Sequence, residues 1–384
     1  MSKITLEKVG PISNAKIDLR DLTVLVGPQA SGKSIFLQTL KLAIDRHHIL
    51  SFFKQHSVVF NGSAKAVLDG YYGRGMGGML RKKPYVTWKN TRFSIESLTR
   101  SKKINNPPEE KLFYIPAQRV VSFNSGISQT FDNFNFGDPY VLRYFAHQIH
   151  RLLQDEFGSL ATLFPSPQRL NAELRGPIEE HIFGGARLKA EQNDFTNSLA
   201  LKIRGLPDSL PFLAWSAGQR EFVPLLLGLY WLCPAGRVKR RGELEWVVIE
   251  EPEMGLHPRA IETFLLLALE LISRGYKVVL STHSTVVLDL IWAIQHIKDS
   301  KGNVRDILNL FSLKQGNNDL KKIAKNALTK DYRVYFFERG KPVKDITSLD
   351  PGAEDEAISN WGDLNDFSGR SANVVAKVIS RTSS

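Results

Sequence analysis

One octapeptide near the amino terminus constrains the fold more than any other segment of this chain. It reads Gly27-Pro28-Gln29-Ala30-Ser31-Gly32-Lys33-Ser34, which has the spacing G-x-x-x-x-G-K-S. The apolar run 22–26 precedes it, and a helical pattern from Ser34 to about Ile44 follows it. A strand, a glycine-rich turn and a helix in this order are the context that a phosphate-binding loop requires. The octapeptide therefore predicts an α/β fold built around a P-loop.

Each part of this loop has a predicted chemical role. The glycines let backbone N–H groups converge on the β- and γ-phosphates of a nucleotide, and the following helix directs its positive end to the same place. Lys33 is expected to reach the β- and γ-phosphate oxygens, and Ser34 to ligate Mg²⁺. All eight residues, 27–34, are therefore candidate ATP-binding residues, and ATP and Mg²⁺ are the expected cofactors.

Two further strand ends carry candidate catalytic residues. The apolar run 246–249 is typical of a buried parallel strand, and Glu250 and Glu251 follow it. At the carboxyl edge of a sheet, where ligands bind, Glu250 is expected to hold Mg²⁺ through a water and Glu251 to polarise the attacking water. His283 follows the strand pattern 277–280 and is a candidate contact to the γ-phosphate. Taken alone, paired acids fit a solvated strand end and a single histidine fits a structural role.

A second candidate phosphate-binding tip opens the helical pattern that runs to about Leu232. It consists of Ser216-Ala217-Gly218-Gln219, here called the signature segment. A hydroxyl, a small residue and a glycine at a helix start can contact phosphate, although an ordinary serine N-cap has the same composition. Because the chain already has a P-loop, a second tip implies ATP bound to another subunit. We therefore expect a head-to-tail homodimer, or a higher oligomer, with two ATP molecules between paired subunits and His257 at the seam.

Composition limits the partners and the compartment. The chain has 384 residues and a formal net charge of +12, which favours an anionic partner beyond ATP. Its cations are clustered at Arg81-Lys82-Lys83, at Arg100, Lys102 and Lys103, and at Arg237, Lys239, Arg240 and Arg241. Such clusters are either solvated loops or nucleic-acid contacts, and residues 81–83 are the candidate nucleic-acid patch. The single cysteine and the absence of a long apolar run or secretory segment predict a cytoplasmic protein that does not enter the membrane.

The pattern along the chain predicts one ATPase head over residues 1–384 with a mixed sheet and an antiparallel β lobe. Within it we expect a basic, β-containing insertion at 52–110, a helical subdomain at 138–190, and a C-terminal hairpin with a polar tail at 310–384. The insertion includes a predicted hairpin of 85–88 with 93–95. The tail is expected to end in a short helix near 372–379.

The P-loop and the signature segment resemble those of ABC-type ATPases of the SMC, RecF and OLD-like group. Two further segments carry the same resemblance: Tyr114-Ile115-Pro116-Ala117-Gln118-Arg119 and Glu250-Glu251-Pro252-Glu253-Met254-Gly255-Leu256-His257-Pro258. The chain looks most similar to the AAA-type ATPases of prokaryotic phage-defence, abortive-infection and retron systems. The resemblance covers residues 1–50, 112–120 and 212–300. It implies that residues 27–34 are Walker A, 216–219 the signature, and Glu250 and Glu251 Walker B with the catalytic glutamate. It also implies that His283 is the switch histidine and that Gln118, or alternatively Gln129, is the Q-loop glutamine at the metal.

The sequence departs from this group in several ways. Ala217 stands where many relatives carry glycine, and Glu250 replaces the usual aspartate. No long coiled coil separates the P-loop from the signature segment. No acidic cluster after residue 300 suggests a fused TOPRIM nuclease, so an effector is expected to be a separate chain.

Three functions compete for this sequence. The leading prediction is an ATP hydrolase that dimerises on ATP and controls a separate effector, a nuclease or a toxin, or a nucleic-acid complex in bacterial anti-phage defence. The alternative is a RecF-like DNA-repair or DNA-binding ATPase. A transporter ATPase subunit is disfavoured, because the stretch between Ser34 and Ser216 is far longer than expected for a transporter head.

Overall fold

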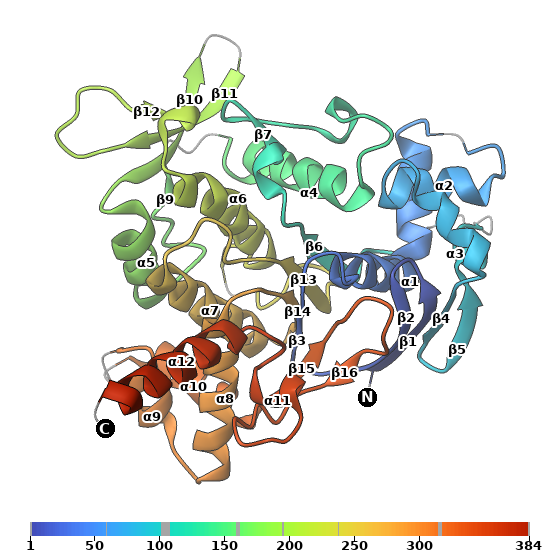
Figure 1. Ribbon diagram of the computed structural model, residues 1–384. Coiled ribbons are helices and arrows are strands. Elements are labelled where there is room, and N and C mark those ends of the chain that lie inside the picture. Colours follow the sequence, from blue (N-terminus) through green and yellow to red (C-terminus); the bar gives the residue numbers. More distant parts are fainter. Residues whose placement is uncertain are drawn as a thin grey trace.

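A six-stranded central sheet forms the middle of the molecule (Figure 1). The computed structural model describes residues 2–58, 60–100, 108–158, 162–193, 196–236, 238–313 and 317–382. The strand order of the sheet is β16-β15-β3-β14-β13-β6, and all of its strands except β16 are parallel. The strands are β3 (Leu22–Val26), β6 (Leu112–Ile115), β13 (Trp246–Glu250), β14 (Lys277–Ser281), β15 (Tyr332–Phe336) and β16 (Lys344–Asp345).

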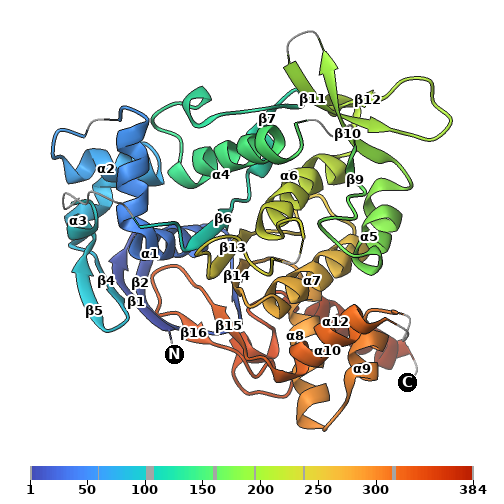
Figure 2. The same cartoon turned by 180° about the vertical axis from the view of Figure 1, so that it is seen from behind.

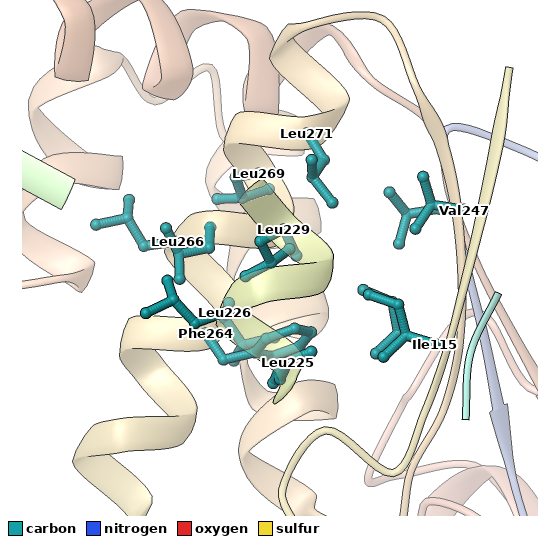
Figure 3. Packing of buried hydrophobic residues seen from close by; sticks show 14 of the residues in the cluster. Ile115, Leu225, Leu226, Leu229, Val247, Phe264, Leu266, Leu269 and Leu271 are labelled. Carbon is teal, nitrogen blue, oxygen red and sulfur yellow. The ribbon is translucent and has the colours of Figure 1, made fainter. Parts of the chain in front are cut away.

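The central sheet is buried on both faces, because successive side chains of its strands enter two different hydrophobic clusters. Val247 packs in one cluster and Val248 in the other. The first cluster holds helices α6 (Ala217–Leu232), α7 (Pro258–Ser273) and α8 (Thr285–Asp299), and the second holds α1 (Lys33–Gln55). Figure 3 shows α6 between the sheet residues Ile115 and Val247 and the leucines of α7. The helix approaches closely at Gly228, where a Cβ would lie 2.9 Å from Ile115 Cδ1.

A four-stranded antiparallel sheet, in the order β2-β1-β4-β5, lies beside α1 (Figure 1). Its strands are β1 (Ser2–Val9), β2 (Ile12–Leu19), β4 (Tyr85–Trp88) and β5 (Thr91–Ser94). The predicted hairpin of 85–88 with 93–95 is present as β4 and β5, and β4 pairs with β1 so that this hairpin extends the β1–β2 hairpin. The same region contains α2 (Ala64–Tyr72), the 3-10 helix η1 (Met76–Lys82) and α3 (Ile95–Leu98).

The third sheet lies at the end of the molecule opposite the C-terminal helices (Figures 1 and 2). Its strands are β7 (Phe123–Asn124), β8 (Ile127–Ser128), β9 (Thr162–Phe164), β10 (Arg187–Asn193), β11 (Thr196–Lys202) and β12 (Leu210–Pro211). Nearby helical segments are η2 (Arg119–Ser122), η3 (Phe131–Asn133), α4 (Tyr140–Arg151), η4 (Leu152–Glu156), α5 (Ala172–Ile178), η5 (Glu179–Phe183) and η6 (Phe212–Ala214). The C-terminal helices are α9 (Val304–Leu310), α10 (Asn318–Thr329), α11 (Glu356–Ser359) and α12 (Asp366–Thr382).

Helix α1 and the C-terminal segment differ from the sequence-based expectation. Helix α1 continues past Ile44 to Gln55, with a non-helical residue at Asp45. The Asp45 carboxylate accepts hydrogen bonds from the amides of Lys111 and Leu112, so a tertiary contact accommodates the kink. Strand β15 joins the central sheet directly beside β3, and α12 is longer than the predicted helix at 372–379. Over the described ranges, no helix is both long and apolar enough to cross a membrane.

Candidate nucleotide site and signature face

The P-loop adopts a conformation that requires glycine at two positions. Gly27 has φ +135°, and a Cβ there would lie 2.1 Å from the carbonyl oxygen of Phe337. Gly32 has φ +109°, and a Cβ there would lie 2.7 Å from Ile12 Cγ1. Both conformations are open to glycine and strained for other residues. The loop is therefore packed tightly against the β1–β2 turn and the segment after β15.

Lys33 begins α1 and is buried beneath the loop. Its ammonium nitrogen donates to the carbonyl oxygens of Gly27 at 2.7 Å and Pro28 at 3.0 Å. An ammonium has three N–H donors, so a third can reach a phosphate oxygen. Burial lowers the pKa of Lys33, and the nearby carboxylates, led by Glu251, oppose that shift.

Glu250 and Glu251 end β13 in different environments. Glu250 is buried, and burial raises the pKa of its carboxyl group against contacts with the hydroxyls of Ser34 and Tyr114. Its Oε2 accepts from the amide of Ala117 at 3.4 Å, while its Oε1 has no hydrogen-bond partner in the described part of the chain. Glu251 is half-buried and has φ +42°, a left-handed conformation that turns its side chain out of the strand direction.

His283 lies beside Glu251, with Nε2 3.6 Å from Oε1. The contact with His283 lowers the pKa of Glu251, so this carboxyl group is ionised at neutral pH. The main chain holds the pair in place, because the amide of Glu251 donates to Ser281 at 2.9 Å and the amide of His283 donates to Glu253 Oε1 at 2.5 Å. Two strand ends thus present a carboxylate and an imidazole to the same space.

Arg119 is a structural residue of the site to which sequence reasoning assigned no role. Its side chain is fully buried, and Nη1 donates to the carbonyl oxygen of Glu250 at 3.1 Å. Nε donates to the carbonyl oxygen of Glu221 in α6 at 3.0 Å. The only signal in the sequence was its position directly after Gln118. Arg119 joins the turn that carries Glu251 to the helix that begins with the signature segment.

The signature segment lies at the start of α6, with Ser216 and Ala217 exposed and Gly218 and Gln219 half-buried. Ser216 is the N-cap, and its hydroxyl accepts from the amide of Gln219 at 3.3 Å while Gln219 Oε1 accepts from the amide of Ser216 at 3.1 Å. Gly218 lies against the turn after β13, because a Cβ there would be 2.9 Å from the carbonyl oxygen of Gly255. His257 caps α7 from the same turn and is exposed. Ser216, Ala217, Gly255 and His257 are all exposed and belong to what is here called the signature face.

A cavity of about 890 Å³ surrounds the P-loop. Residues 29–35, Glu251 and His283 line it, whereas the described lining includes no residue of the signature segment. Arg81 and Lys82 of the predicted nucleic-acid patch also line this cavity, but Lys83 does not. Of the other clustered cations, Lys102, Lys103 and Arg237 lie outside the described residues.

Neither candidate Q-loop glutamine is among the described residues that line the cavity. Gln118 is exposed, although the neighbouring amide of Ala117 donates to the Glu250 carboxylate. Gln129 donates from its side chain to the carbonyl oxygen of Val121 at 2.6 Å. The metal role of Gln118 therefore stays a prediction.

The residues present fit a nucleotide-bound Mg²⁺. The buried, unpartnered Oε1 of Glu250 and the Ser34 hydroxyl beside that carboxyl group are oxygen ligands of the kind Mg²⁺ takes. No group of three or more histidine, cysteine or carboxylate side chains that could hold a metal occurs in the ranges described. When bound, the ion would neutralise charge on the phosphates.

The P-loop shares its cavity with Glu251 and His283, and the helix that begins with the signature segment starts outside that cavity. Together with the largely parallel central sheet, this is the arrangement of an ABC-type P-loop ATPase. The predicted fold class is confirmed. The chain belongs to the family described as "AAA domain, putative AbiEii toxin, Type IV TA system", whose model matches residues 87–289. This membership also confirms the resemblance to AAA-type ATPases of abortive-infection systems.

Several solved structures are similar to this chain at low identity. They include the SMC head domain from Thermotoga maritima, with 12% identity and a TM-score of 0.36 over 89% of this chain and 97% of that chain. An SmcHead bound to the C-winged helix domain of ScpA has 12% identity and a TM-score of 0.41 over 89% and 96%. An Smc head with an extended coiled coil, bound to the C-terminal domain of ScpA derived from Pyrococcus furiosus, has 11% identity and a TM-score of 0.37 over 90% and 96%. The comparison with curated proteins gives no match.

Proposed function

We propose that this chain hydrolyses ATP in a Mg²⁺-dependent reaction and dimerises head-to-tail when ATP is bound. The observation that carries the proposal is that the predicted phosphate-binding residues lie in two separate places. Lys33, Glu251 and His283 gather around one cavity, while Ser216 is exposed outside it on the signature face. A phosphate-binding helix tip turned away from its own P-loop is suited to the nucleotide of a second copy.

In this proposal each described side chain has one task at the phosphates. The loop amides and Lys33 bind the β- and γ-phosphates. Glu251, an ionised carboxylate, orients the attacking water and accepts its proton, and His283 hydrogen-bonds the γ-phosphate. Ser34 and Glu250 would hold the Mg²⁺. Ser216 and Gly218 of the partner copy donate to the γ-phosphate from the opposite side.

The head-to-tail arrangement is tested by mixing two inactive variants. Lys33→Ala removes the P-loop cation, and Ser216→Arg blocks the signature segment. In a mixed dimer, the Ser216→Arg chain supplies an intact P-loop and the Lys33→Ala chain an intact signature segment. One of the two sites is then complete, so an equimolar mixture should recover roughly a quarter of wild-type ATPase activity. A mixture as inactive as either variant alone would rule out sites shared between subunits.

We further propose that ATP-driven dimerisation controls a separate effector, a nuclease or a toxin, in bacterial anti-phage defence in the cytoplasm. The support is the toxin and toxin–antitoxin description of the family. A RecF-like DNA-repair ATPase is the second candidate, favoured by the net charge of +12. A pulldown of Glu251→Gln with ATP and Mg²⁺ from the native cell separates them. A stoichiometric nuclease or toxin supports the first, and chromosomal DNA with repair proteins supports the second.

A further inference from the structure

One wall of the nucleotide cavity has no task in the ATPase chemistry described above. It consists of Gly10 and Pro11 in the β1–β2 turn, residues 75, 76, 78, 79, 81 and 82 in and before η1, and Arg339–Gly340 after β15. These three segments, here called the η1 wall, contact one another. Lys82 Nζ donates to the carbonyl oxygen of Gly10 at 3.3 Å, and the amide of Gly340 donates to the carbonyl oxygen of Pro11 at 3.3 Å.

The strand order places the η1 wall on the side of the P-loop away from the catalytic residues. Strand β3, which carries the P-loop, lies between β14 and β15 (Figure 1). Glu251 and His283 follow β13 and β14 on one side, and Arg339 follows β15 on the other. Because Glu251 acts at the γ-phosphate, the opposite side of the loop faces the α-phosphate and the nucleoside.

The side chains of the η1 wall have the chemistry of a nucleotide contact. Arg81, Lys82 and Arg339 are cations, and neither arginine forms an ion pair within the described part of the chain. Met76 is half-buried and Met79 is buried, and both line the cavity. Flexible thioether side chains pack well against flat aromatic rings, and cations bind phosphate. A surface for a nucleic-acid backbone would not need buried methionines beside its cations.

We propose that the η1 wall is the nucleoside half of the ATP site. Met76 and Met79 contact the base, and Arg81 and Arg339 hold the α-phosphate and the ribose. This inference rests on the proposed function. It gives Arg81 a nucleotide-binding role in place of the nucleic-acid contact predicted from the sequence, and Lys82 supports the wall through its hydrogen bond to Gly10.

The test compares a cation that lines the cavity with a neighbouring cation that does not. Binding of a nonhydrolysable ATP analogue and of inorganic triphosphate, both with Mg²⁺, is measured by titration calorimetry. Arg81→Glu should weaken binding of the ATP analogue roughly tenfold, while Lys83→Glu, an exposed control two positions away, should bind like wild type. Met76→Ala should weaken binding of the ATP analogue by roughly fivefold, because the base loses its contact with the Met76 side chain. Binding of inorganic triphosphate, which has no base, should be unchanged.

Two results would overturn the inference. One is equal behaviour of Arg81→Glu and Lys83→Glu, with both losing salt-dependent DNA binding and keeping ATP affinity; residues 81–83 would then be a nucleic-acid patch. The other is a Met76→Ala variant that binds the ATP analogue as wild type does. If Lys33→Ala loses binding while the η1-wall variants keep it, only this inference fails. If the wild-type protein binds no ATP, the proposed function fails as well.

Discussion

The guanidinium of Arg119 holds the main chain of Glu250, with Nη1 3.1 Å from the carbonyl oxygen, and its Nε reaches Glu221 in α6. The same side chain also donates to the carbonyl oxygens of Glu251 and Pro252. One buried arginine therefore fixes the turn that orients the predicted catalytic base and connects it to the helix behind the signature segment.

Replacing this arginine should separate nucleotide binding from turnover. Arg119→Met leaves several buried carbonyl oxygens without donors, so the free energy of unfolding should fall by roughly 3 kcal/mol. The turnover rate should fall more than tenfold, because Glu251 loses its orientation, while ATP affinity stays near wild type because the P-loop is not contacted. Arg187→Met, on an exposed arginine of β10, is the control. Unchanged turnover in a folded Arg119→Met protein would show that the contact is structural only.

Glu110, whose side chain is 9% exposed, should make stability depend on pH. Burial raises the pKa of Glu110 to about 7, because desolvation outweighs the attraction of Lys41, whose ammonium also pairs with Asp45 at 2.8 Å. The folded protein therefore keeps a proton that the unfolded chain releases near its ordinary pKa of 4.5. This contribution to stability is full below pH 4.5 and is lost as the pH rises through 7.

Glu110→Gln has no such proton and removes this dependence. The unfolding free energy of Glu110→Gln minus that of wild type should rise by about 2 kcal/mol between pH 5 and pH 8. Urea denaturation at several pH values measures it. Glu109→Gln changes the exposed neighbouring residue and should run parallel to wild type. A Glu110→Gln profile parallel to wild type would show that Glu110 is ionised throughout this range.

The central fold could be predicted from the sequence because its signals are local. The P-loop glycines, the apolar strands before Glu250 and His283, and the serine cap at Ser216 each depend on neighbouring residues alone. The role of Arg119 could not be predicted, since its partners are more than one hundred positions away in the sequence. The position of Arg81 beside the P-loop could not be predicted for the same reason. A cluster of charges in the sequence does not show where that segment lies in the fold, and only the pairing of β4 with β1 brings it to the cavity.

Glu251→Gln gives the most direct test of the predicted catalytic base. The substitution keeps the shape of the side chain and removes its ability to accept a proton, so turnover should fall by roughly a hundredfold or more. ATP binding should persist, because Lys33 and the loop amides remain. The ATP-bound dimer should therefore accumulate, which size-exclusion chromatography with light scattering detects. Glu262→Gln, on an exposed glutamate of α7, is the control and should turn over normally. Normal turnover in Glu251→Gln would remove Glu251 from catalysis and leave the polarisation of water to His283.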